Sequence, residues 1–186
     1  MLLISFILTA VLLGGIIALL VYSILQPSNR IWPPPAQQTW QYYIVWLLTL
    51  LSFGGFIAVG LLDWNSLVWP GIVRWPVGVG LIIGGNALAW VGLRQLSLKT
   101  TSGSKGPFVT EGLYQYSRNP QYLGDIAIIG GWAILSASAW AIPLCLGGIV
   151  AFAVTPFAEE PWLEELHGDA YREYRSRVGR FLGRRG

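Results

Sequence analysis

The chain has 186 residues, of which 54% are apolar and only 11% are charged, whereas soluble domains carry about 25% charged residues. Six acidic residues and six arginines fall within residues 159–186, so most of the charge lies in the tail. Uncharged tracts occupy residues 1–29, 31–62, 75–93 and 126–158. Because about 20 residues cross a bilayer as a helix, this composition excludes an ordinary soluble enzyme and a disordered chain. A single cysteine in an apolar tract excludes a disulfide scaffold.

The first apolar tract predicts a membrane helix from Leu2 to Leu25. It lacks a basic start and is longer than the roughly 7 to 15 apolar residues of an export signal, so we expect it to be retained. A loop should follow over residues 26–39, because their four prolines lack the N–H that a helix needs. A second helix is predicted over residues 40–62, and it ends at the turn-forming residues 63–66.

A third helix is predicted from Pro76 to Leu96, after a turn rich in tryptophan, a residue that is enriched at membrane interfaces. The apolar stretch that ends at Ala158 begins near Tyr122 and covers about 37 residues, which is too long for one crossing. Residues 136–140 supply the expected bend of a two-helix hairpin. Five crossings are therefore predicted.

The basic residues predict how these helices are oriented in the membrane. Residues 94–118 contain four of them and the tail contains six, and two crossings separate these segments. Because basic residues are enriched in cytoplasmic loops, both segments are assigned to the cytoplasm. This assignment places the N-terminus outside and leaves Arg74 as the one basic residue on the outer side. Membrane orientation therefore explains the net charge of +3 better than nucleic-acid binding does. The chain also has no strip of basic and aromatic residues that would bind a nucleic acid.

The segment from Phe108 to Gly124, before the fourth predicted helix, is dense in polar side chains. Its three tyrosines offer flat faces to a planar heterocycle at an interface. Arg118 presents a planar fork of donors that suits a carboxylate, and Asn119 can both donate and accept. Pro120 would begin the next helix and leave amide donors available at its N-terminus. A simpler interpretation is that these residues only anchor the helix at the lipid head groups.

A second polar stretch begins at Glu159 and Glu160, where the fifth helix is predicted to leave the membrane. A carboxylate there could hold an ammonium group or a pair of ribose hydroxyls through charge-assisted hydrogen bonds. Alternatively, the two acids could lie in the first turn of a following helix and stabilise it by interacting with the positive end of its dipole. Beyond Gly168, apolar side chains recur at helical spacing and predict an amphipathic cytoplasmic helix. They are Tyr171, Tyr174, Val178 and Phe181.

Taken in order, these residues resemble the signature of integral-membrane methyltransferases, a family that includes isoprenylcysteine carboxyl methyltransferases and phospholipid N-methyltransferases. The matching elements are Gly112-x-Tyr114, Arg118-Asn119-Pro120-x-Tyr122, Glu159-Glu160, Gly168-x-x-Tyr171-x-x-Tyr174 and Arg177-Val178. A helical hairpin separates the second element from the third, as it does in that family. The resemblance covers residues 108–182, and the first three helices match only in being helices.

The resemblance implies transfer of a methyl group from S-adenosylmethionine, which enters from the cytoplasm, to a lipid-borne or amphiphilic acceptor in the bilayer. It implies Arg118 and Glu159 as catalytic residues and no metal site. The implied cofactor contacts are Phe108, Val109, Gly112, Tyr114, Asn119, Pro120, Gln121, Tyr122, Glu159 and Glu160. Transfer to a carboxylate or thiolate would depend mainly on positioning and exclusion of water. An amine would also have to lose a proton, for which Glu159, Glu160 or His167 are candidate bases.

Four departures from the family's pattern leave the acceptor open. Gly106 and Asn119 stand where members often have histidine, and His167 replaces a phenylalanine. Thr155 stands where the carboxyl methyltransferases carry an arginine that meets the substrate, so an isoprenylcysteine carboxylate loses its obvious partner. The alternatives are an isoprenylcysteine-like or lipid acceptor, a phospholipid N-methyltransferase, and a non-catalytic subunit of a larger membrane complex. A sterol-reductase-like protein with a nicotinamide cofactor is the weakest alternative.

The sequence thus predicts an all-α integral membrane protein with about five transmembrane helices, the last two forming a hairpin, and a C-terminal amphipathic cytoplasmic helix. We expect a three-helix membrane region over residues 1–98 and a methyltransferase-like core over residues 99–186. The cofactor site and the C-terminus should both face the cytoplasm. The expected partners are the membrane and a lipid or lipidated acceptor, with no nucleic acid, and a partner in a membrane complex stays open.

Overall fold

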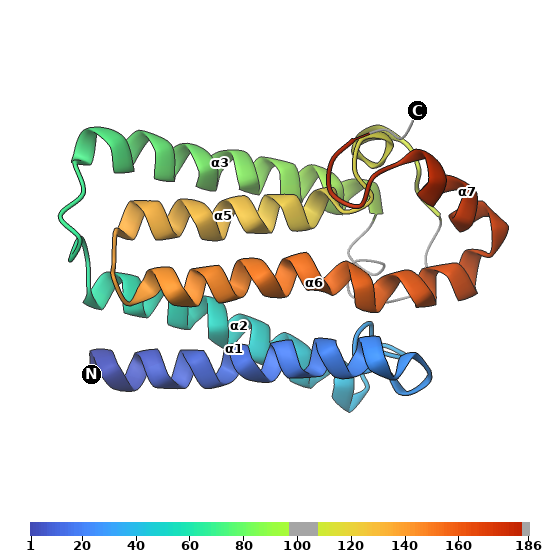
Figure 1. The fold of residues 1–186 in the computed structure, drawn as a ribbon, viewed down its shortest axis with the longest axis horizontal. Coiled ribbons are helices and arrows are strands. Elements are labelled where there is room, and N and C mark those ends of the chain that lie inside the picture. The colour runs from blue at the N-terminus through green and yellow to red at the C-terminus, as the bar shows by residue number, and fades with distance from the viewer. Residues whose placement is uncertain (97–107, 184–186) are drawn as a thin grey trace.

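A computed structural model of the chain describes residues 1–96 and 108–183, which fold into a bundle of long helices without a strand (Figure 1). The helices are α1 (Leu2–Leu25), α2 (Trp40–Leu62), α3 (Gly71–Leu96), α5 (Pro120–Ser136), α6 (Ala141–His167) and α7 (Asp169–Arg177). Two short 3-10 helices, η1 (Pro27–Asn29) and η2 (Gly112–Gln115), lie in the loops. The predicted all-helical character of the fold is confirmed.

Within residues 1–96 and 108–183, four helices, α1, α2, α3 and α6, are long and apolar enough to cross a membrane. Helix α5 has 17 residues, which at 1.5 Å per residue spans about 26 Å, close to the roughly 30 Å of a bilayer's hydrocarbon core. It runs between α3 and α6 in Figure 1. A fifth crossing by α5 stays a prediction, and so does the orientation of the bundle.

The loops gather at the two ends of the bundle (Figure 1). One end carries the connection from α1 to α2, η2, α7 and the C-terminus. The opposite end carries the N-terminus, the connection from α2 to α3 and the turn between α5 and α6. Both segments of the methyltransferase-like signature therefore lie at one end, as the predicted hairpin requires.

Helix α3 begins five residues earlier than predicted, at Gly71, so Pro76 lies inside the helix and not at its start. The backbone N–H groups of Val73 and Arg74 both donate to the carbonyl of Pro70, at 3.1 Å each, and these bonds form the first turn. A proline interrupts a helix less when it lies close to the N-terminus, because few carbonyls precede it. The extra turn lengthens α3 toward the loop that follows α2.

Arg74, the basic residue predicted on the outer side, is buried at the end of α5. Its Nη1 donates to the carbonyl of Leu135 at 2.9 Å, and its guanidinium lies 4.8 Å from the Trp64 ring and 5.8 Å from the Trp75 ring. A cation is favoured at a helix C-terminus because the helix dipole is negative there. Arg74 is therefore placed by its contact with α5.

Glycines spaced seven residues apart bring α3 and α5 into close contact. A Cβ built on Gly131 would lie 2.7 Å from the carbonyl oxygen of Gly78, and one on Gly124 would lie 2.6 Å from that of Gly85. Neither distance leaves room for a side chain. Small residues of this kind let membrane helices approach closely enough for their backbones to touch. This contact holds the start of α5, and with it the signature loop, against α3.

Helix α6 continues through Pro156 and Pro161 to His167 without a break. The sequence predicts that the fifth helix ends before Glu159, whereas the structure keeps Glu159 and Glu160 inside α6. The interpretation that these acids stabilise the first turn of a following helix is therefore wrong. The long helix carries both carboxylates to the end of the bundle where the signature loop lies.

Helix α7 ends at Arg177, so Val178 and Phe181 lie outside it, and the predicted amphipathic helix is shorter than expected. The chain then turns back toward the loop before α5, where the N–H of Arg118 donates to the carbonyl of Gly179 at 3.0 Å. This backbone pairing takes the place of further helical turns.

Some predictions fall on residues outside the described part of the chain. They concern Gly106, the basic residues Lys99 and Lys105, and the boundary between residues 98 and 99. The division into a membrane region and a methyltransferase-like core therefore stays a prediction.

Candidate functional site

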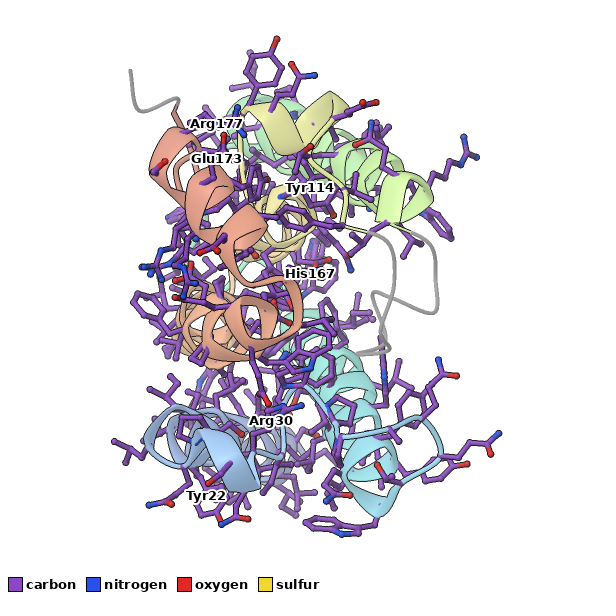
Figure 2. All side chains as sticks on the ribbon, turned by 90° about the vertical axis from the view of Figure 1, so that its right-hand side faces the viewer. Tyr22, Arg30, Tyr114, His167, Glu173 and Arg177 are labelled. Atoms are coloured by element: carbon purple, nitrogen blue, oxygen red, sulfur yellow. The ribbon has the colours of Figure 1, made fainter. Side chains whose placement is uncertain are left out.

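A cleft of about 110 Å³ lies at the loop end of the bundle, between the segment from Phe108 to Tyr122, the last turns of α6, and α7. Figure 2 looks onto this end and labels Tyr114, which belongs to η2, and His167, the last residue of α6. Most of the predicted site residues line this cleft. They are Phe108, Val109, Tyr114, Arg118, Asn119, Gln121, Tyr122 and Glu159. Gly112, Pro120 and Glu160 do not line it.

Glu159 is held at the edge of the cleft by two hydrogen bonds to the same oxygen. Its Oε1 accepts one from Trp32 Nε1 at 2.7 Å and another from the hydroxyl of Tyr122. Within the described residues, its Oε2 makes no hydrogen bond and remains available to a ligand. Trp32 comes from the loop between α1 and α2, and the sequence analysis missed it. Trp32 could have been predicted only from the topology, which places the loop after α1 on the same side of the membrane as the signature residues.

Arg118 and Glu160 form a buried ion pair beside the cleft. Arg118 Nη1 lies 2.9 Å from Glu160 Oε1, and the two side chains are 5% and 11% exposed. Glu160 also accepts hydrogen bonds from Arg180 Nε and Nη2, both at 2.8 Å. Arg118 Nη1 donates in addition to the hydroxyl of Tyr171 at 3.2 Å. Glu160 therefore holds Arg118 in position and ties the tail to α6.

One donor of Arg118 is unpaired within the described residues. Its Nε is buried and has no hydrogen-bond partner in the part of the chain that the structure describes. A buried N–H without a partner costs about 1–3 kcal/mol. A carboxylate or another acceptor bound in the cleft would remove this cost.

Gly112 and Pro120 shape the loop from outside the cleft. Gly112 has a φ of +61°, and a Cβ there would collide with the side-chain amide of Gln95. The Oε1 of that amide accepts from the N–H of Leu113 at 3.2 Å, which attaches η2 to α3. Pro120 is the first residue of α5, so the predicted helix start is confirmed. Direct contact of either residue with a cofactor stays a prediction.

Helix α7 covers the cleft with aromatic side chains. Tyr171 and Tyr174 are buried with Tyr114 and pack against Phe108, and the hydroxyl of Tyr174 donates to the carbonyl of Tyr114 at 2.6 Å. Burial, followed by the charge of Glu160, raises the pKa of Tyr171 to about 12. Burial also raises the pKa of Tyr114. These phenols are therefore neutral at physiological pH.

His167 and Asn119 have partners that the sequence did not predict. The ring of His167 stacks on Phe108, with ring centroids 4.8 Å apart and planes 25° from parallel, and it lines the cleft. Asn119 Nδ2 donates to the carbonyl of Arg180 at 3.0 Å. Asn119 therefore holds the tail against the loop, and its amide oxygen accepts no hydrogen bond from the described residues.

The family comparison matches the Phospholipid methyltransferase family over residues 73–170, which is more than half of the chain. This chain belongs to the phospholipid methyltransferase family. The match runs from the first turn of α3 to the start of α7, and it includes most of the residues that line the cleft. Neither the curated proteins nor the solved structures contain a significant match.

Membership in the phospholipid methyltransferase family confirms the resemblance inferred from the sequence. Together with the four apolar helices, it makes the chain a membrane methyltransferase that acts on a lipid-related acceptor.

The methyltransferase has a second cavity, of about 200 Å³, between α1, α2, α5 and α6, which we call the inner cavity. Gln121 and Tyr122 line both the inner cavity and the cleft. Asp125 also lines the inner cavity, and the sequence analysis passed over it by treating its surroundings as one apolar tract. A single acidic residue within an apolar helix was the signal that could have found it, because ionisable residues are rare in membrane helices.

Proposed function

We propose that this chain transfers a methyl group from S-adenosylmethionine, bound in the cleft, to a lipid-borne acceptor that reaches the cleft through the inner cavity. The observation that carries the proposal is that Gln121 and Tyr122 line both spaces, so the cleft and the inner cavity lie side by side. Tyr122 is also hydrogen-bonded to Glu159. A site at the loop end that contains Arg118 and Glu159 therefore adjoins a cavity among the apolar helices, as a water-soluble donor and a lipid acceptor require.

The residues of the cleft fit the chemical groups of this cofactor. Phe108 and Tyr114 line the cleft and offer aromatic faces to an adenine ring. Arg118 Nε has no hydrogen-bond partner within the described residues, and the carboxylate of the cofactor could become its partner. Glu159 Oε2 can accept hydrogen bonds from a ribose or an ammonium group. Arg118 and Glu159, the two residues predicted to be catalytic, thus have binding and positioning roles in this proposal.

Bound S-adenosylmethionine supplies an electrophilic methyl group on a positively charged sulfur. The chain's own contribution is positioning and exclusion of water, which account for much of the rate of such transfers. Tyr122 and Trp32 hold the Glu159 carboxylate, and Glu160 holds Arg118. The aromatic side chains of α7 cover the cleft and keep water away.

Replacing Glu159 with glutamine is expected to weaken binding of S-adenosylmethionine by at least about tenfold, because a charge-assisted hydrogen bond is replaced by a neutral one. The substitution keeps the size of the side chain and an oxygen that can accept from Trp32 and Tyr122. Titration calorimetry of the detergent-purified protein with S-adenosylmethionine and its demethylated product measures the effect.

The matched control is Glu165→Gln, six residues further along α6, where the side chain is exposed and does not line the cleft. It should bind the cofactor as the wild type does. Equal affinity in Glu159→Gln and Glu165→Gln would contradict the placement of the cofactor. No saturable binding by the wild type would contradict the proposed function and favour a non-catalytic subunit.

A further inference from the structure

The inner cavity contains polar groups that the fold leaves without partners. Asp125, in the second turn of α5, forms no hydrogen bond or ion pair with any residue that the structure describes. Ser52 Oγ and Trp46 Nε1, both from α2, line the same cavity and are buried without a hydrogen-bond partner in the described ranges. Ser52 is 2% exposed, so water does not reach its hydroxyl from the surface.

These groups are costly unless a ligand pairs with them. A buried polar atom without a partner costs about 1–3 kcal/mol. An ionisable side chain among apolar membrane helices costs more and is usually retained for binding or transport. Most other residues around the inner cavity are apolar, among them Leu13, Phe53 and Phe152, and cannot pair with Asp125. A ligand head group with hydrogen-bond donors would satisfy it.

The charge of the inner cavity selects the kind of head group. Asp125 is the one charged residue among the described residues that line it, and no lysine, arginine or histidine is among them. The hydroxyl of Thr155, also in the lining, donates within α6 to the carbonyl of Ala151 at 2.8 Å. A free carboxylate would therefore face Asp125 without a cation between them. An amine or ammonium group would be attracted.

The position of Asp125 links this head group to the cleft. Asp125 follows Tyr122 by three residues in α5, so the two side chains share a face of the helix. Tyr122 borders both the inner cavity and the cleft. A group bound to Asp125 therefore lies next to the residue that the inner cavity shares with the cleft.

We infer that the inner cavity holds the head group of the methyl acceptor and that Asp125 is its specificity-determining contact, which selects an amine or ammonium head group over a carboxylate. This inference rests on the proposed function, because the site is an acceptor site only if the donor occupies the cleft.

The test uses the full chain in an uncharged sugar detergent, without cofactor, and two single-chain amphiphiles of equal alkyl length. One ends in a primary ammonium group and the other in a carboxylate. The melting temperature of the protein is recorded against the concentration of each amphiphile, because a ligand that binds the folded state raises it. We expect the wild type to bind the ammonium amphiphile at least about tenfold more tightly, the usual scale of one charge-assisted hydrogen bond.

Three variants make the test specific. Asp125→Asn should lose the preference for the ammonium amphiphile, and Asp125→Glu, which keeps the charge, should retain it. Glu111→Gln removes an exposed acid outside the inner cavity and should behave as the wild type does. Asp125→Asn should fold normally, since Asp125 has no partner to lose within the described residues, and its melting temperature without amphiphile verifies this.

A preference that survives in Asp125→Asn, or a wild type that binds both amphiphiles equally, would overturn the inference. The same samples are titrated with S-adenosylmethionine. Cofactor binding without an ammonium preference would refute the acceptor site and leave the proposed function standing. An ammonium preference that depends on Asp125, in a protein that binds no cofactor, would uphold the amine-binding site and refute the proposed function.

Discussion

Replacing Glu160 with alanine is expected to lower the free energy of unfolding by about 3–5 kcal/mol, because it leaves the buried Arg118 guanidinium without its counterion. The side chain of Arg118 is 5% exposed and lies 2.9 Å from Glu160. The same substitution releases Arg180, which donates two hydrogen bonds to Glu160. For a chain of this length, the loss should appear as a fall of roughly 10 °C in the melting temperature of the detergent-purified protein.

The matched control for Glu160→Ala is Glu164→Ala, one turn further along α6. Glu164 also contacts two arginines, Arg172 at 3.4 Å and Arg175 at 2.9 Å, but these side chains are about half exposed. Exposed ion pairs contribute about 0–1 kcal/mol, so this variant should melt within a few degrees of the wild type. If the two alanine variants had the same melting temperature, the ion pair of Arg118 would not hold the cleft together.

Replacing Gly131 with alanine is expected to lower the free energy of unfolding by about 3 kcal/mol, the upper end of the range for overpacked sites. The new Cβ would lie 2.7 Å from the backbone carbonyl of Gly78 on α3. A backbone atom cannot turn aside as the end of a side chain can, so the two helices must move apart. The thermal melting curve of the purified protein measures the effect.

The control for Gly131→Ala is the neighbouring substitution Gly130→Ala. No heavy atom lies within 4 Å of a Cβ at Gly130, and alanine favours a helix over glycine by about 1 kcal/mol. Gly130→Ala should therefore melt at or above the wild-type temperature. Equal melting temperatures for the two variants would show that α3 and α5 are not in close contact at Gly131.

The helix pattern could be predicted from the sequence because apolar tracts and prolines determine it locally. The predicted limits of the first two helices, residues 2–25 and 40–62, agree with the structure. The start of α3 and the continuation of α6 through two prolines could not be predicted in this way. There, hydrogen bonds and packing within a long membrane helix outweigh the local effect of proline.

The cleft was largely predictable because its residues occur in a recognisable order. The partners that hold these residues were not, because they come from distant parts of the chain. Trp32 reaches Glu159 from the loop after α1, and Arg180 reaches Glu160 from the tail. Asp125 was missed for another reason, namely that one acid among many apolar residues hardly changes the average hydropathy of a tract.

We propose that this member of the phospholipid methyltransferase family moves a methyl group from S-adenosylmethionine to a lipid. The most direct measurement incubates the purified protein with methyl-labelled S-adenosylmethionine and a lipid extract, and then separates the lipids. We predict labelled lipid with the wild type and with Glu165→Gln, and much less with Glu159→Gln. Folded wild-type protein that binds the cofactor and labels no lipid, or Glu159→Gln that labels lipid as fast as the wild type, would contradict the claim.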